Sequence, residues 1–218
     1  TAAVKQALEF INKTNKSDLV LMTDADAMFE LDTVPNLLKW FTDKSIGCVG
    51  ATPKRIGQRI EEEGHRTLFS MVRHLESKID STPFLEGSCM VWRTSSLDLE
   101  ALHVTSNADD AQIATDVRIH GLRVIQDSDA HFIDHAPFER KEHSRQKVRR
   151  AQGLQRHLLR QREHYYNRRL GRFAPILRQE AALHILTPLL LVGAFIATLA
   201  RWALIGFAEI DFTNATLT

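Results

Sequence analysis

The chain of 218 residues is poor in cysteine. Its only two cysteines, Cys48 and Cys89, lie in apolar, strand-like stretches, so we expect buried free thiols, consistent with a reducing compartment, and no disulfide framework. A signal peptide, internal repeats and low-complexity tracts are all absent. The chain also begins without methionine in what reads as the middle of a helix, which predicts a fragment without its amino terminus. The length suits one domain with an appendage.

Charge is balanced overall, at a net +1, but it is unevenly distributed. Residues 140–178 hold thirteen Lys and Arg against Glu142 and Glu163, a net +11. The rest of the chain holds 15 basic and 25 acidic residues, a net −10. Such an asymmetry predicts a polyanionic partner, which can be nucleic acid, a membrane surface or a phosphorylated lipid.

An uncharged run at residues 185–200, resuming after Arg201 at residues 202–208, narrows that choice. It is long enough to cross a hydrocarbon core of about 30 Å as one helix, and Arg201 can snorkel to the surface. No polar stripe at helical spacing marks it as a buried amphipathic helix. A basic flank before the span belongs on the cytoplasmic side. We therefore expect an integral protein of the cell membrane with its catalytic part in the cytoplasm, and no nucleic-acid partner.

The strongest chemical signal is the stretch Leu-Val-Leu-Met-Thr-Asp-Ala-Asp-Ala-Met at residues 19–28. The short apolar run predicts a buried central strand, with Asp24 and Asp26 projecting from a turn at its end. Ligands of open α/β sheets sit at the carboxyl ends of strands. Hard cations such as Mg²⁺ take oxygen ligands, so one or two carboxylates beside a substrate phosphate suffice. The pair predicts a metal–phosphate site, and a strand that ends in a plain polar loop is the alternative.

The rest of the chain alternates helices with strands, which predicts an α/β sheet. An apolar face on the helix expected at residues 60–79 is either core or a lid over the site, and it consists of Leu68, Met71, Val72 and Leu75. We expect the other helices at 2–14, from Asp32 or Thr33 through Phe41, and at 108–120. The expected strands are 18–23, 46–51, a broken strand at 84–92, and a pair at 122–126 and 130–133.

Two adjacent acids, Asp109 and Asp110, open the helix expected at residues 108–120. One acid would suffice to favour the positive end of the helix, which is the alternative explanation. A second one, in a chain that already has a metal-type pair, favours a general base that takes a proton from an acceptor hydroxyl.

Four groups of residues, in this order, resemble the motifs of family 2 glycosyltransferases with a GT-A fold. They are Asp24-Ala25-Asp26, residues 84–88, Asp109-Asp110 and residues 146–150, and residues 121–124 with 129–132 look like the family's strand pair after the catalytic helix. The resemblance covers about residues 1–180, and the apolar helix then matches the integral-membrane members. It implies an α/β fold with a partial GT-A, Rossmann-like sheet and flanking helices. Basic interfacial helices and a C-terminal transmembrane helix would follow. The implied divisions are 1–139 (catalytic domain), 140–180 (basic interfacial segment), 181–209 (transmembrane helix) and 210–218 (tail).

The resemblance also implies a role for each matching residue on the donor side. Asp24 and Asp26 would hold a divalent metal, Mg²⁺ or Mn²⁺, on the diphosphate of a nucleotide-sugar. His135 could supply a further metal ligand, although a solvated loop histidine is the equal alternative. Asp110 would be the catalytic base and Asp109 the acid that precedes it.

On the acceptor side, Glu86, Gly87 and Ser88 would lie near the acceptor. Residues 146–150 match a Gln-x-x-Arg-Trp motif that sits over the active site near the membrane, through Gln146, Arg149 and Arg150. Arg149 would also contact the donor. Arg150 stands where the family has Trp, which removes an aromatic platform for a sugar ring and argues against processive polymer synthesis.

The implied activity is transfer of a sugar, with inversion, from a metal-bound nucleotide-sugar to a membrane-associated acceptor. That acceptor is a polyprenyl phosphate, a lipid or a growing glycan. A metal and arginines neutralise the diphosphate leaving group, and one base without an evident protein nucleophile fits a single displacement. In the family the nucleoside is held largely by the first half of the sheet, which would precede Thr1.

Two other functions stay open at this point. A phosphohydrolase of the haloacid dehalogenase type also has an apolar strand that ends in Asp-x-Asp. It would want Thr or Val after the second Asp, where this chain has Ala27 and Met28. A non-enzymatic, membrane-anchored scaffold whose basic segment binds anionic lipid is the other alternative.

Overall fold

The structure is a computed structural model that describes residues 1–218 except 15–16, 57–59, 136–139 and 216–218. Side chains are described outside residues 55–67, 135–143 and 206–218, and outside 15–16. The chain divides into two compact units, Thr1–Arg178 and Gln179–Thr218, and each is described by itself.

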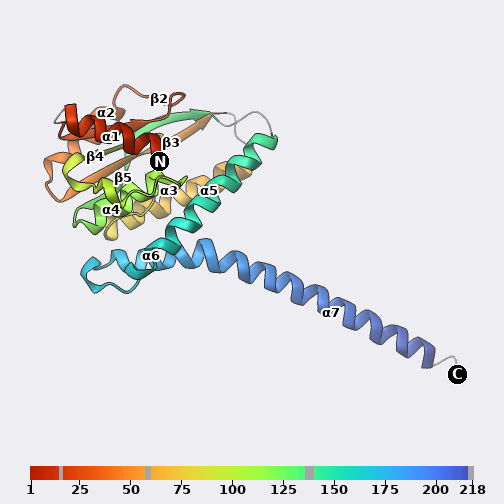
Figure 1. The fold of residues 1–218 in the computed structure, drawn as a ribbon. Helices are drawn as coiled ribbons and strands as arrows, with labels where there is room; N and C mark the ends of the chain where they lie inside the picture. The colour runs from red at the N-terminus through yellow and green to blue at the C-terminus, as the bar shows by residue number, and fades with distance from the viewer. Residues whose placement is uncertain (15–16, 57–59, 136–139, 216–218) are drawn as a thin grey trace. The chain divides into compact units, whose positions relative to one another are not determined.

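The first unit contains a five-stranded mixed sheet in the order β1-β4-β3-β5-β2 (Figure 1). β3 and β5 run parallel, and the other neighbouring pairs are antiparallel. The strands are β1 (Leu19–Thr23), β2 (Met28–Phe29), β3 (Ile46–Ile56), β4 (Cys89–Arg93) and β5 (Arg123–His135). A mixed α/β fold agrees with the class predicted from the sequence.

Within the sheet that the described residues form, β1 is not the central strand that the sequence predicted. β1 lies at an edge of the described sheet and pairs with β4 alone. Its apolar side chains nevertheless pack on both faces, Val20 and Met22 against one core cluster and Leu19 against the other. An apolar run indicates that side chains on both faces of a strand pack against other parts of the protein. It does not indicate whether the backbone of that strand pairs with a neighbour on one side or on both.

Two apolar clusters form the core, one on each face of the sheet, because neighbouring residues of a strand point to opposite sides. Helices α1 (Ala2–Thr14) and α4 (Asp109–Ile119) contribute Leu8, Ile113 and Val117 to the first cluster. Helix α2 (Thr33–Leu38), extended by a 3₁₀ turn over Lys39–Thr42, contributes Leu37 to the second. These helices hold the strand ends and the intervening loops in place.

Cys48 and Cys89 are buried free thiols on opposite faces of the sheet, as predicted. Burial raises the pKa of both, to about 12 for Cys89. Neither thiol ionises at neutral pH, so neither is a nucleophile or a metal ligand in the folded chain.

Most other elements lie where the sequence predicted them. Helix α3 spans Ile60–Ile79, as predicted. Helix α4 ends before Gly121, whose φ of 95° lies in the left-handed region that favours glycine. The predicted pair of strands at 122–126 and 130–133 is instead the single strand β5. Residues 84–88 form a loop and not the first half of a strand, because the turn from Glu86 to Cys89 interrupts it.

The face of α3 named above is not part of the core, and its alternative role as a lid over the site stays a prediction. Leu68, Met71 and Leu75 are exposed, with 57%, 58% and 45% of their surface accessible. The opposite side of the helix packs on the sheet through polar side chains: Ser70 and Ser77 both bond to Gln126 of β5. The polar side of α3 is therefore the buried one.

Helix α5 (Arg140–Arg160) carries much of the basic segment. Short 3₁₀ turns follow at Gln161–His164 and Arg168–Leu170, and two others lie earlier in the chain at Thr94–Ser96 and Leu99–Ala101. Helix α6 (Phe173–Ala181) contains the boundary between the two units.

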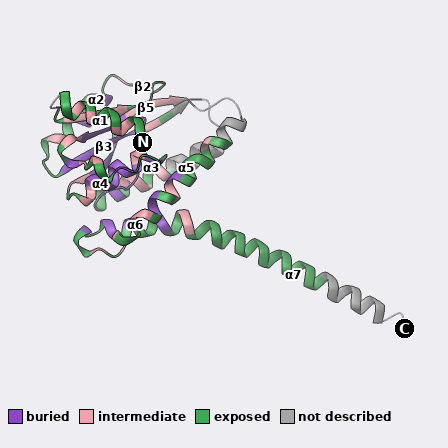
Figure 2. Ribbon diagram, viewed as in Figure 1, coloured by how far each residue is buried: buried purple, intermediate pink, exposed green. Residues whose placement is uncertain are grey.

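The second unit consists of the end of α6, a π-helical turn at Ala182–Leu186 and helix α7 (Thr187–Ala215). Pro188, which lacks an N–H, is the second residue of α7, two residues after the widened turn. The helical stretch Phe173–Ile205 is the one candidate membrane span in the described part of the chain, by length and composition, and its most apolar window is wholly exposed (Figure 2). The transmembrane helix predicted at residues 181–209 coincides with this stretch over most of its length.

Candidate active site

The acidic pair lies in the turn between β1 and β2. Asp24 O accepts a hydrogen bond from the N–H of Ala27 at 3.2 Å, which closes the turn, and the side chains of Asp24 and Asp26 are exposed. Ser88 Oγ donates to Asp24 Oδ2 at 2.6 Å. This bond joins the Asp24 turn to the loop before β4, so two motifs 64 residues apart in the sequence meet here.

Gly87 brings the third motif to the same place. A Cβ atom added to it would lie 3.4 Å from Met22 Cε of β1, 3.4 Å from Asp110 Cβ and 3.7 Å from Asp110 Oδ2. The loop therefore passes between the end of β1 and the first turn of α4, where a larger residue would press on Asp110. The predicted metal-type pair, the 86–88 loop and the predicted base thus come together, as their order in the sequence suggested.

Asp110 is held in an environment that favours its neutral form. Burial is the largest cause and raises the pKa of Asp110 to about 6, with the negative charges of Asp109 and Glu86 acting in the same direction. The N–H of Ala111, which donates to Asp110 Oδ1 at 2.8 Å, and the cation of Arg73 oppose that rise. A carboxyl group that titrates near neutral pH is suited to accept a proton during a reaction.

Arg73 is a residue of this site that the sequence did not reveal. It extends from α3, and its Nη1 donates to Glu86 Oε1 at 2.7 Å. The pair is four-fifths buried, so the cation both neutralises Glu86 and acts electrostatically on Asp110. The apolar face of α3 suggested a buried stripe, which would have directed Arg73 to solvent. The reversed orientation of the helix brings it to the site.

Asp24 and Asp26 suit a divalent cation that is bound by the protein and by a substrate at the same time. Asp24 has one oxygen engaged by Ser88, and Asp26 makes no hydrogen bond to a described residue. No cluster of three or more His, Cys, Asp or Glu side chains forms a closed cage among the described residues. Two carboxylates suit Mg²⁺ or Mn²⁺ when water and a diphosphate complete the coordination. The side chain of His135, the further predicted ligand, lies outside those that the structure describes.

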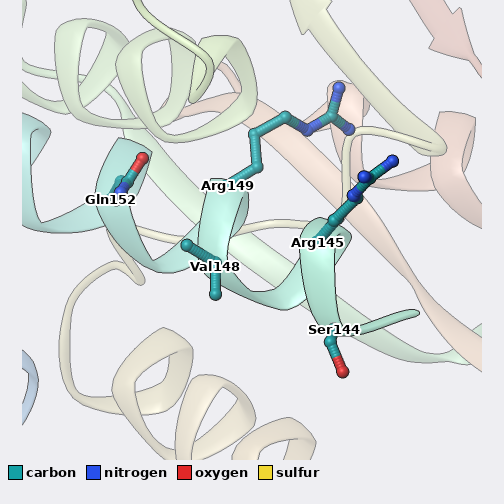
Figure 3. Close-up of a pocket in the computed structure, with 5 residues that line it drawn as sticks. All are labelled: Ser144, Arg145, Val148, Arg149 and Gln152. Carbon is teal, nitrogen blue, oxygen red and sulfur yellow. The ribbon is translucent and has the colours of Figure 1, made fainter. Parts of the chain in front are cut away.

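The residues of the predicted Gln-x-x-Arg-Trp-like motif lie on α5. Gln146 is half-buried, and Arg149 and Arg150 are exposed. Arg149 projects from α5 on the same side as Arg145, and both line a pocket of about 350 Å³ together with Ser144, Val148 and Gln152 (Figure 3). Within the described residues, neither Arg149 nor Arg150 bonds to Asp24, Asp26 or Asp110. Their predicted contact with donor or acceptor stays a prediction.

Two contacts fix α5 against the start of α4. At Gly153 an added Cβ would lie 3.4 Å from the backbone carbon of Asn107 and 3.5 Å from Ala108 Cβ, so the helix passes close to the residues that precede Asp109. One turn further on, His157 Nε2 lies 2.9 Å from Thr115 Oγ1 in a buried hydrogen bond. Burial lowers the pKa of His157 to about 3, with Arg160 and His103 adding to the effect, so the ring is neutral. A glycine inside a strongly basic helix was the only sequence signal of this contact.

Comparison with known proteins adds an independent observation. No protein-family model matches the chain, and no curated protein matches it. Among solved structures it is similar to the mannosyltransferase PcManGT from Pyrobaculum calidifontis in complex with GDP-Man and Mn²⁺. The TM-score is 0.77 and the identity 27%, over 91% of this chain and 54% of that one.

The chain has a glycosyltransferase-like fold. It spans about half the length of the mannosyltransferase it matches. The match covers nearly all of this chain.

Proposed function

We propose that the chain is the greater part of a metal-dependent, inverting glycosyltransferase of the GT-A type, in family 2. The observation that carries the proposal is the convergence of Asp24, Gly87 and Asp110, in a chain similar to a protein solved with GDP-Man and Mn²⁺. GDP-mannose is the first donor to test. The similarity also favours sugar transfer over the phosphohydrolase that shares the Asp-x-Asp strand end.

Asp24 and Asp26 hold the cation on the donor diphosphate in this proposal. Neutralisation of the departing diphosphate is what the bound Mg²⁺ or Mn²⁺ supplies. Ser88 orients Asp24 through its 2.6 Å hydrogen bond, and Arg149 adds positive charge on the donor side.

Asp110 acts as the base. It takes the proton of an acceptor hydroxyl while that oxygen forms the bond to the sugar carbon and the nucleoside diphosphate leaves from the opposite side. Burial, together with the charges of Asp109 and Glu86, keeps the pKa of Asp110 high enough for this, and Arg73 opposes a further rise. A phosphate acceptor is already ionised near pH 7 and needs no base, so dependence on Asp110 separates hydroxyl acceptors from polyprenyl phosphate.

The acceptor reaches the site from the membrane. Glu86, Gly87 and Ser88 border its position, and Gln146, Arg149 and Arg150 extend it along α5. Residues 181–209 anchor the protein in the cell membrane, and the basic residues 140–180 lie on the cytoplasmic leaflet. Catalysis by residues 1–139 then takes place on the cytoplasmic side.

The first test compares Asp26→Asn with Asp32→Asn in the intact enzyme. Both aspartates are exposed, and Asp32 makes no side-chain capping bond to α2, so it is a matched control. Asp26→Asn should lower release of nucleoside diphosphate from the sugar donor by at least about a hundredfold, as expected for loss of a metal ligand. Asp32→Asn should leave it unchanged.

The same assay separates the alternatives. Full activity of Asp26→Asn, or full activity in excess chelator, would contradict the metal site. Release of free phosphate from phosphomonoesters, with the sugar donor left intact, would favour the phosphohydrolase. A scaffold would show neither activity and would not respond to either substitution.

A further inference from the structure

The exposed side of α3 carries a continuous apolar stripe. Its residues follow one another at spacings of three and four, which places them on one face of a helix: Leu68, Met71, Leu75 and Ile79. Each has between 45% and 58% of its surface accessible. From Leu68 to Ile79 the stripe is about 16 Å long, at about 1.5 Å per residue.

The other side of α3 packs on the sheet through polar groups. Ser77 Oγ accepts from the N–H of Gln126 at 2.9 Å, and Glu76 Oε2 accepts from Thr82 Oγ1 at 2.8 Å. Arg73 pairs with Glu86. These bonds fix the rotation of the helix about its axis, so the stripe cannot turn inward without breaking them. A surface helix ordinarily buries its apolar side, and here that side faces away from the sheet.

We propose that the α3 stripe lies in the interfacial layer of a lipid bilayer. The inference does not depend on the proposed function and concerns neither the basic segment nor α7. It rests on three observations: the stripe is outward and apolar, Lys78 beside it is exposed and suited to anionic headgroups, and the same chain carries a helix long and apolar enough to span a membrane.

A second copy of the chain fits the stripe less well. Four half-exposed side chains offer a few hundred Å² of apolar surface, whereas a stable protein–protein interface buries about 800 Å² on each partner. A bilayer needs no matching shape. It accepts a narrow stripe whose flanks are polar.

The proposed contact fixes the height of the candidate active site above the membrane. Arg73 and the stripe lie on opposite sides of one helix, and a helix with its side chains is about 10 Å across. The Arg73–Glu86 pair would then sit about 10 Å above the apolar layer, within reach of a lipid headgroup.

Single cysteines can test this in the full-length chain reconstituted in vesicles of phosphatidylcholine and phosphatidylglycerol. Met71→Cys and Leu75→Cys introduce a labelling site on the stripe, and Ser95→Cys places one on an exposed 3₁₀ turn as the control. Both native thiols are buried, so an environment-sensitive fluorophore reacts at the new position. Two positions on the stripe guard against a variant that fails to fold.

The labels at Met71 and Leu75 should shift to the blue on reconstitution. They should be quenched by a nitroxide on the lipid acyl chain and lose quenching by aqueous iodide, while Ser95 keeps its iodide quenching and ignores the lipid quencher. Iodide quenching at the stripe equal to that at Ser95 would overturn the proposal. Protection from both quenchers would also overturn it, because protein and not lipid would then cover the stripe.

Discussion

At the scale of single residues, the centre of the candidate site is a set of charges around one carboxyl group. Burial and two neighbouring carboxylates raise the pKa of Asp110, and Arg73 limits the rise. A single basic side chain therefore affects both Glu86 and Asp110. This arrangement makes the pH dependence of the activity the most direct readout of the site.

Activity on a hydroxyl acceptor should rise with pH through about 6 and level off above about 7. Asp110 is a base only when ionised, and its pKa is raised to about 6, so protonation below that value removes the base. The measurement is kcat/KM for the acceptor in the intact enzyme from pH 5 to 8. Asp110→Asn should remove the acidic limb and about two to four orders of magnitude of rate. Loss of turnover in Asp109→Asn alone would assign the base to Asp109.

Glu86→Gln should move that acidic limb to lower pH. The carboxylate of Glu86 raises the pKa of Asp110, and its removal also frees Arg73 to act on Asp110 alone, so both effects lower that pKa. Glu100→Gln, an exposed glutamate that pairs only with Lys5, is the matched control and should leave the profile in place. An unchanged profile, or a shift to higher pH, in Glu86→Gln would show that the charge of Glu86 does not raise the pKa of Asp110.

At the scale of elements, the proposed role of the basic motif depends on the close approach of α5 to the start of α4. Gly153 permits that approach, because a methyl group there would just touch Asn107 and Ala108. The buried Thr115–His157 bond holds the two helices in register one turn further along. Any donor or acceptor contact of Arg149 depends on this packing.

Gly153→Val should lower kcat/KM at least about tenfold while the chain stays folded. A branched side chain cannot fit against Asn107 and will displace α5, and strain of this kind costs about 1–3 kcal/mol. Ala151→Val, at an exposed position of the same helix, controls for helix propensity and should be nearly silent. Circular dichroism checks folding. Equal activity of the two variants would show that the position of α5 does not matter for transfer.

The elements show where sequence reasoning succeeds and where it stops. The bounds of α1 and α3 follow from the sequence pattern, and the resemblance to family 2 glycosyltransferases implied that the Asp24–Asp26 pair, residues 86–88 and Asp110 share a site. The apolar run of β1 could not distinguish an edge from a centre, since both faces are covered in either case. The sequence showed which side of α3 is apolar but not whether that side faces the core or solvent. Arg73 could therefore not be predicted as a site residue, because it reaches the site only when the apolar side faces away from the sheet.

At the scale of the whole chain, the charge asymmetry and the apolar helix are both consistent with the proposed place at a membrane. Arg168, Arg169 and Arg172 are exposed in the first unit, and Arg178 stacks over Tyr166 at 5.0 Å. Each cation near an anionic leaflet contributes about 1 kcal/mol and is screened within a Debye length.

A chain ending at Arg178 should bind anionic vesicles at low salt and lose the salt-sensitive part of that binding near half-molar salt, where the Debye length is about 4 Å. Replacing Arg168, Arg169 and Arg172 with Glu should weaken binding at low salt, whereas Lys44→Glu, outside the segment, should change it little. Vesicle flotation gives the bound fraction. Equal binding to neutral and anionic vesicles would refute the electrostatic attraction, and no binding to either would refute the membrane role of the segment.

The reactivity of the two buried thiols can be used to measure opening of the sheet. Cys48 and Cys89 lie on opposite faces and stay protonated while the strands are packed, so alkylating reagents cannot reach a reactive sulfur in the folded chain. Alkylation then proceeds only as fast as the sheet opens. The rate at which the thiols disappear therefore measures how often the core opens, separately on its two faces.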